Sequence, residues 1–213
     1  MNYLSVTGRV PSQKMARLVA YESPLERDFY LMLEFDRGVD YYEEQPLAIS
    51  YQHPTVGKRT YTPDVLVRYF KDKSLGGPRA PELFEIKPRD ELRRNWTDFK
   101  PKFKAARRYA RKKGWRFIIV TEREIRTPYL DNAKFLMRYI HDQPNYEREN
   151  VLLEMMADLR ESDPETLIAA IFSDRMNKAR LIPSLWRLIG CRAIGVDLTR
   201  PLTMQSRIWE IQE

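Results

Sequence analysis

The sequence predicts an α/β protein in which a mixed sheet flanked by helices is followed by a smaller, mostly helical domain. Two observations lead to this prediction. From about residue 24 to residue 121 the apolar patterns run helix, strand, strand, strand, helix, strand, which is the order of one α/β layer. Beyond about residue 127 the patterns are mainly helical, so we expect one domain over 1–130 and a second over 131–213.

The first helix is expected from about 24 to 36. Ser23 is a favourable N-cap, and Pro24 occupies the first helical position, where a missing N–H is no loss. Apolar residues then recur at helical spacing from Leu25 to Met32, which gives the helix one face for the core.

Three strands are expected after this helix. The alternating segment "VDYYEEQPLAISYQ" (39–52) and the segment "TYTPDVLVRYF" (60–70) are predicted to pair around the turn "VGKR" (56–59). A loop over 71–81 then leads to a third strand, "ELFEIKP" (82–88).

The layer is completed by a helix and a strand. Apolar residues at helical spacing from Phe99 to Ala110 predict a helix that stops at Gly114, because Gly favours the left-handed conformation that ends helices. The apolar segment "WRFIIVT" (115–121) predicts a short strand in the middle of a sheet.

The second domain is predicted to contain helices and a terminal hairpin. Helical patterns cover 129–140, 147–161, 162–172 and 181–190, and the tail reads as two strands joined by a turn around 199–202. Helices followed by a hairpin are typical of a small winged-helix domain.

Composition narrows the class of protein. The chain has 213 residues, of which 43% are hydrophobic and 31% charged, as in ordinary folded proteins. Its apolar runs are shorter than the roughly 18–20 residues that span a bilayer, and "MNYLSVTGRV" lacks the apolar core of a signal peptide, so we expect a cytoplasmic protein. Because Cys191 is the single cysteine and there are two histidines, a metal site would be bound by oxygen atoms.

Positive charge is concentrated in one segment. Residues 87–116 contain 13 Lys or Arg and three Asp or Glu, a local balance of +10 in a chain of net charge +7. Aromatic residues alternate with these cations, which suits a surface that follows DNA phosphates, although a solvated helix face would look similar. The candidate DNA-binding residues are Arg93, Arg94, Lys100, Lys102, Lys104, Arg107, Arg108 and Arg111.

Acidic residues and a lysine lie on the two strands before this segment. Glu85 and Lys87 are two residues apart and project from the same face of their strand, and antiparallel pairing can bring Asp64 beside Glu85. Two converging carboxylates repel each other unless a cation such as Mg²⁺ lies between them, and Lys87 can orient water or neutralise a phosphate. The pattern predicts a site for phosphodiester hydrolysis. Structural ion pairing between these residues is the alternative.

Glu26 on the first helix has two interpretations. Ser23 and Glu26 have the spacing of a capping box, in which the Glu only satisfies a backbone N–H. A third carboxylate from this helix would otherwise complete or support a metal site. Glu22 is a rival for that role one turn earlier.

These motifs resemble those of known nucleases. Pro63-Asp64 followed by Glu85-Ile86-Lys87 resembles the PD-(D/E)xK motif of restriction-endonuclease-like enzymes. Together with "ESPLERDFYLMLEFD", "EEQPLAISY" and the late "GVDLTRPLT", it resembles the TnsA family over about residues 20–210. TnsA proteins are the endonuclease subunits of heteromeric bacterial transposases, including those of CRISPR-associated transposons.

The resemblance implies a fold, an activity and partners. It implies a restriction-endonuclease-like fold with catalytic Glu26, Asp64, Glu85 and Lys87, of which Glu26, Asp64 and Glu85 would bind Mg²⁺, or Mn²⁺ as a substitute. Some family members carry Gln at the position of Glu85. The implied substrate is double-stranded DNA at the 5′ ends of the transposon. The implied partners are a DDE-type transposase subunit, which acts on the 3′ ends, and an AAA+ ATPase regulator that contacts the C-terminal domain.

Two other functions stay open from the residues alone. The chain can be a stand-alone restriction or repair nuclease with the same chemistry, or a non-catalytic winged-helix DNA-binding adaptor. The C-terminal domain can contact DNA or protein, but its candidate recognition segment, 181–190, has Arg187 as its one cation. Trp186 and Trp209 are candidate interface anchors, with ordinary core packing as the alternative.

Overall fold

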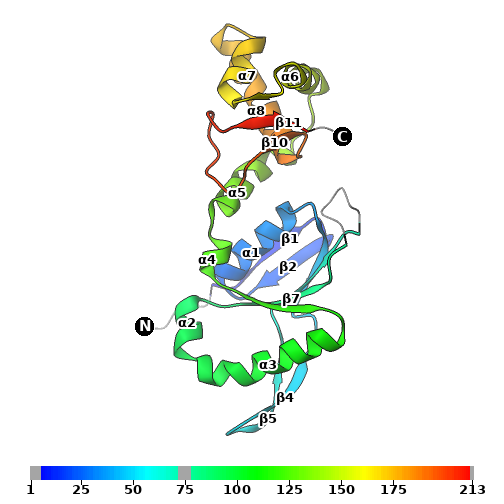
Figure 1. The fold of residues 1–213 in the computed structure, drawn as a ribbon, viewed down its shortest axis with the longest axis vertical. Coiled ribbons are helices and arrows are strands. Elements are labelled where there is room, and N and C mark those ends of the chain that lie inside the picture. Colours follow the sequence, from blue (N-terminus) through cyan, green and yellow to red (C-terminus); the bar gives the residue numbers. More distant parts are fainter. Residues whose placement is uncertain (1–5, 72–77, 212–213) are drawn as a thin grey trace. The chain divides into compact units, whose positions relative to one another are not determined.

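The computed structural model describes residues 6–71 and 78–211, and the chain divides into two compact units (Figure 1). The first unit ends at Arg126 and the second begins at Thr127, just before the boundary expected from the sequence. None of the helices in these residues is both long enough and apolar enough to cross a membrane.

The first unit is built on a four-stranded mixed sheet with the order β3-β6-β7-β8. Strand β6 pairs antiparallel with β3 and β7, whereas β7 and β8 are parallel. The mixed sheet expected from the sequence is therefore present. The strands are β3 (Val39–Glu44), β6 (Val65–Tyr69), β7 (Glu82–Ile86) and β8 (Arg116–Val120).

Helices cover both faces of this sheet (Figure 1). On one face the ring of Phe29 packs against Phe84 of β7, with ring centroids 5.0 Å apart. On the other, Phe103 packs against Phe117 of β8 at 5.9 Å and lies in one cluster with Leu83. The helices of this unit are α1 (Pro24–Phe35), α2 (Arg89–Arg94), α3 (Trp96–Lys112) and α4 (Glu122–Ile125).

The start of α1 and the end of α3 that were predicted from the sequence are confirmed. Ser23 accepts a hydrogen bond from the backbone N–H of Glu26 and so caps α1, and Pro24 is at its first position. Helix α3 ends at Lys112, and Gly114 has a φ of 71°, the left-handed conformation expected of a glycine at this place.

The predicted pairing of 39–52 with 60–70 is confirmed, but neither segment forms one continuous strand. Gln45 has a φ of 47° and Pro46 follows it, so the predicted strand over 39–52 breaks into β3 and β4 (Ile49–His53). The segment 60–70 divides in the same way, into β5 (Gly57–Tyr61) and β6. Strands β4 and β5 form a hairpin separate from the sheet, while β3 pairs with β6.

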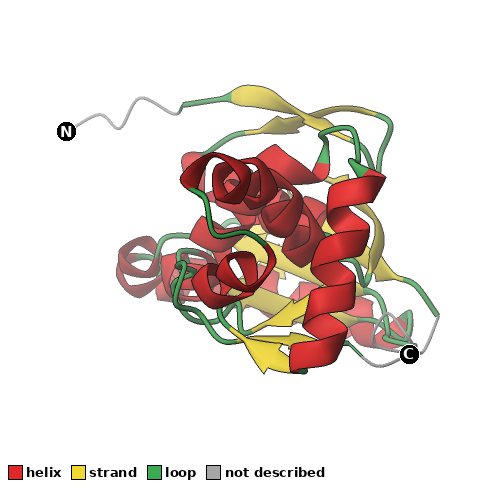
Figure 2. Cartoon of the chain, turned by 90° about the horizontal axis from the view of Figure 1, so that it is seen from above, coloured by secondary structure: helices red, strands yellow, loops and turns green. Residues whose placement is uncertain are grey.

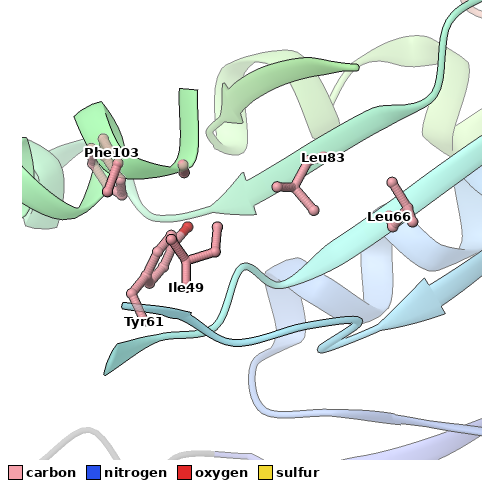
Figure 3. Packing of buried hydrophobic residues seen from close by; sticks show 7 residues of the cluster. Ile49, Tyr61, Leu66, Leu83 and Phe103 are labelled. Atoms are coloured by element: carbon pink, nitrogen blue, oxygen red, sulfur yellow. The ribbon is translucent and has the colours of Figure 1, made fainter. Parts of the chain in front are cut away.

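The β4–β5 hairpin is attached to the sheet and α3 by a shared core (Figure 3). Ile49 and Tyr61 come from the hairpin, Leu66 and Leu83 from the sheet, and Phe103 from α3. Burial of these large apolar side chains stabilises the arrangement by roughly 1.5–3 kcal/mol for each fully buried side chain.

A second hairpin was not predicted. It consists of β1 (Gly8–Ser12) and β2 (Arg17–Tyr21), which lie side by side near the N-terminus (Figure 2). Its two strands have five residues each and lack a clear apolar alternation, so the hairpin is difficult to predict from the sequence. In the predicted loop 71–81, the middle part, 72–77, lies outside the described residues.

The second unit is mainly helical, as predicted. Asp163 caps α7 with Pro164 at the first position, and Asp174 caps α8, which begins earlier than the predicted 181–190. The predicted terminal hairpin is present, with β10 antiparallel to β11, and β9 adds a third strand to it. The elements are α5 (Pro128–Ile140), α6 (Tyr146–Leu159), β9 (Glu161–Ser162), α7 (Pro164–Ile171), α8 (Arg175–Gly190), β10 (Ile194–Val196) and β11 (Ile208–Glu210).

The two tryptophans of this unit differ in exposure. Trp186 is buried and its ring packs against Phe135 with centroids 5.2 Å apart, so ordinary core packing accounts for it. Trp209 lies over Gly195 and is 36% exposed.

Candidate active site

Strand pairing brings Asp64 and Glu85 together at one end of β6 and β7. Val65 faces Phe84 in the antiparallel register, which places Asp64 opposite Glu85. The backbone N–H of Asp64 donates to the carbonyl of Phe84 at 3.1 Å and fixes this pairing. The antiparallel juxtaposition expected from the sequence is confirmed.

The carboxylate of Asp64 is held in a half-buried position. Its Oδ2 accepts a hydrogen bond of 2.6 Å from the backbone N–H of Ile86. Burial, and next the negative charge of Glu85, raise the pKa of Asp64 to about 7, against the opposing effects of Lys87 and of the Ile86 hydrogen bond. This electrostatic strain is what a bound cation would relieve.

Glu85 is more deeply buried, with 1% of its side chain exposed. Its Oε1 accepts a hydrogen bond from the ammonium of Lys102 at 3.0 Å, and its Oε2 accepts one from the hydroxyl of Tyr61. Both oxygens of this carboxylate are therefore engaged by residues of α3 and β5.

Lys87 follows Glu85 at the end of β7. Its backbone N–H donates to Val120 at 3.1 Å, which ties this end of β7 to β8. Burial lowers the pKa of Lys87, but the charges of Asp64 and Glu85 outweigh burial and raise it from its ordinary value. The ammonium is therefore cationic at neutral pH and interacts electrostatically with both carboxylates.

Glu26 has the capping arrangement and also faces the site. Its carboxylate accepts hydrogen bonds from the Ser23 hydroxyl at 2.9 Å and from the backbone N–H of Glu22 at 2.8 Å. It lines a pocket of about 430 Å³ together with Asp64 and Glu22, while Glu85 is not part of that lining. Glu22 in turn accepts a hydrogen bond from the amide of Gln45. Capping is thus observed, and a metal-binding role for Glu26 stays a prediction.

Comparison with protein families identifies the first unit. Residues 36–122 match the family model described as TnsA-like endonuclease N terminal. This part of the first unit is therefore similar to the N-terminal domain of TnsA-like endonucleases. The matched range includes Asp64, Glu85 and Lys87, whereas Glu26 precedes it. No curated protein sequence matches the chain.

The basic residues of the TnsA-like domain lie mostly on its surface. Those on α2 and α3 that were predicted to bind DNA are exposed, apart from Lys102. The exposed members of the predicted set are Arg93, Arg94, Lys100, Lys104, Arg107, Arg108 and Arg111.

Lys102 differs from its neighbours on α3. Only 16% of its side chain is exposed, and its ammonium contacts Glu85 instead of lying on the open surface. The helical period explains the difference: Lys102 is three and four residues before Ala105 and Ala106, which are both buried, so it lies toward the inner side of α3. Lys102 therefore has different surroundings from the other predicted DNA-binding cations, and its contact with DNA stays a prediction.

A groove runs between α3 and the β4–β5 hairpin. It has a volume of about 510 Å³, and Lys100, Lys104 and Arg108 line it from successive turns of α3. Tyr51 and Pro54 line it from the hairpin, which sequence reasoning did not connect with DNA. Three cations along one wall suit a polyanionic backbone.

Tyr61 is the residue of the site that sequence reasoning missed. It lies three residues before Asp64, but it belongs to the separate hairpin, and the predicted continuous strand concealed that position. Burial, followed by the charge of Glu85, raises the pKa of Tyr61, so its hydroxyl keeps its proton and donates to Glu85.

The oxygen donors fit a Mg²⁺ ion. Within the part of the chain that the structure describes, no three His, Cys, Asp or Glu side chains are grouped closely enough to hold a metal. Mg²⁺ is nevertheless commonly held by one or two carboxylates, with water and phosphate oxygens as its other ligands. Asp64 opposite Glu85 supplies such a pair of hard oxygen donors, and burial, followed by the charge of Glu85, raises the pKa of Asp64.

Proposed function

We propose that this chain is the Mg²⁺-dependent DNA endonuclease subunit of a heteromeric transposase and hydrolyses phosphodiester bonds at the 5′ ends of the transposon. The observation that supports this function best is the convergence of Asp64, Glu85 and Lys87 within a TnsA-like endonuclease domain. The groove lined by Lys100 and Lys104 on α3 provides a neighbouring path for the DNA backbone.

The residues divide the chemistry among them. Asp64 and Glu85 would hold the metal, which when bound polarises the scissile phosphate and stabilises the negative charge that develops on it. Lys87 places an ammonium beside the carboxylates, where it can orient the attacking water and neutralise a phosphate oxygen. Phosphate contacts along α3 position the duplex but do not read its sequence, so recognition of the transposon ends falls to a partner subunit.

The second unit is proposed to be a winged-helix-like domain that contacts the AAA+ ATPase regulator, in an assembly that also contains a DDE-type transposase subunit. A role in protein contact is supported by Arg187, the single cation of the segment 181–190. Its guanidinium donates to both carboxylate oxygens of Glu149 at 3.0 Å and is therefore engaged within the unit instead of facing DNA.

Titration calorimetry with Mg²⁺ tests the metal site directly. We expect the wild type to bind Mg²⁺ and Asp64→Ala to lose binding, because one of two carboxylate ligands is removed. Asp90→Ala is the matched control, since Asp90 has 85% of its side chain exposed on α2 in the same unit. If the wild type binds no Mg²⁺ either with or without DNA, the proposed nuclease function is contradicted.

Cleavage assays then separate the transposase subunit from a stand-alone nuclease. We expect cutting at transposon 5′ ends when the DDE-type transposase subunit and the ATPase regulator are present. Efficient cleavage by the isolated chain on unrelated DNA would instead favour a restriction or repair nuclease.

A further inference from the structure

Lys102 occupies an unusual position for a lysine on a basic surface helix. Its Nζ lies 4.4 Å from the ring centroid of Phe99, 4.8 Å from that of Tyr61 and 5.0 Å from that of Phe103. Aromatic faces attract cations, and they hold this ammonium at 3.0 Å from Oε1 of Glu85. The side chain is thus fixed toward the candidate active site.

The contact with Lys102 has a direct effect on Glu85. The second oxygen of that carboxylate accepts a hydrogen bond from the hydroxyl of Tyr61. Both oxygens of Glu85 therefore already accept a hydrogen bond, one from Lys102 and one from Tyr61. A cation that takes Glu85 as a ligand must therefore replace or share one of these donors. The positive charge of Lys102 also opposes the approach of a second cation.

We propose that Lys102 is a positioning residue that neutralises Glu85 in the metal-free protein and thereby weakens binding of Mg²⁺ until DNA is present. This inference rests on the proposed function of the site. Lys102 faces Glu85 and is not among the residues that line the groove of Lys100 and Lys104. The scissile phosphate, which the proposed function brings to the metal site, offers the ammonium another partner and frees Glu85 for the metal, so DNA and Mg²⁺ bind cooperatively.

The experiment measures Mg²⁺ affinity by titration calorimetry on the full chain without DNA. Lys102→Met removes the charge and keeps an apolar stem among the aromatic rings, and we expect it to bind Mg²⁺ about tenfold more tightly than the wild type. Lys112→Met is the matched control, because it removes the same charge from an exposed position on the same helix that does not line the groove. We expect its affinity to stay within about twofold of the wild type, as is usual for a surface charge.

The same measurement with a DNA duplex and Ca²⁺, which replaces Mg²⁺ to avoid cleavage, tests the coupling. DNA is expected to raise the affinity of the wild type for Ca²⁺ by a larger factor than it raises that of Lys102→Met. Equal factors in the two proteins would contradict the coupling.

Folding is checked by thermal denaturation of each variant. Lys102→Gln provides the same comparison if Lys102→Met fails to fold, since it also removes the charge. A purely structural role predicts weaker metal binding on substitution, because Glu85 would lose its support, so unchanged or weaker Mg²⁺ binding by a folded, neutral variant overturns the proposal.

Failure of this proposal is distinguishable from failure of the metal site itself. If the wild type binds Mg²⁺, Asp64→Ala loses it and Lys102→Met equals the wild type, only the role of Lys102 is refuted. If neither the wild type nor Lys102→Met binds Mg²⁺ with or without DNA, both proposals fall together.

Discussion

The ionised carboxylate of Asp64 destabilises the folded protein at the same place where it could serve as a metal ligand. Its carboxylate is largely removed from water and lies opposite Glu85, and both effects favour the protonated form in the folded protein. At neutral pH without metal, the folded state therefore carries an electrostatic cost that the unfolded chain does not have. Functional sites commonly destabilise the folded state in this way, and favourable interactions elsewhere in the fold offset the destabilisation.

The pH dependence of stability is the first consequence. The pKa of Asp64 is about 7 in the folded protein and close to 3.8 when unfolded, so its contribution to stability is fully present below about 3.8 and is lost as the pH rises through 7. In EDTA we expect Asp64→Asn, which cannot ionise, to be more stable than the wild type at pH 8, by on the order of 2–4 kcal/mol.

Denaturant unfolding of both proteins between pH 5 and pH 8 measures this difference. The advantage of Asp64→Asn should shrink toward pH 5, where Asp64 is mostly protonated in the folded wild type. A difference that does not change with pH would show that Asp64 is not the group that titrates.

Residues of the site could be predicted from the sequence to different extents. Asp64, Glu85 and Lys87 follow from strand alternation and from one antiparallel pairing, both of which depend on local patterns. The contacts of Glu85 with Lys102 and Tyr61 depend on how α3 and a separate hairpin pack against the sheet. Such packing is decided by tertiary contacts that no local pattern encodes.

Helix α3 combines two surfaces in one element. Its inner side buries Phe103, Ala106 and Ala110, and its outer side carries the cations that line the groove. The sequence predicted this helix well because the apolar period is clear. It did not predict that the neighbouring hairpin separates from the sheet, because the break at Gln45 depends on a left-handed backbone conformation at a residue other than glycine.

Charge reversal on α3 tests the groove. We expect Lys104→Glu and Arg108→Glu each to weaken binding of a DNA duplex and to reduce the slope of log affinity against log salt by about 1 or more, as expected for the loss of a phosphate contact. Lys112→Glu is the control, because Lys112 is exposed on the same helix but does not line the groove. Equal losses for all three variants would indicate only a general charge effect.

The whole molecule consists of two units, each with buried residues of its own. The first has the aromatic cluster around Phe103, and the second buries Leu136, Leu167 and Leu185. The change from a mixed pattern to a helical one located this division from the sequence. The small sheet of the second unit was harder to predict, because β9 has two residues and pairs with a strand far along the chain.

A shortened chain tests the separation of roles. We expect residues 1–126 to fold, to bind Mg²⁺ with an affinity close to that of the full chain, and to lose co-purification with the AAA+ regulator. Circular dichroism establishes folding before binding is compared. Retention of the regulator by the folded, shortened chain would assign that contact to the first unit.

The two donors on Glu85 also suggest how TnsA-like proteins can differ from one another at this position. A glutamine at this position has one acceptor oxygen and an NH₂ group, so it cannot accept hydrogen bonds from both Lys102 and Tyr61 as the carboxylate does. An ammonium beside that amide would also lose its counter-charge in a site with little water. Relatives with Gln here are therefore expected to have replaced the lysine on the following helix, and the two positions, 17 residues apart, should co-evolve.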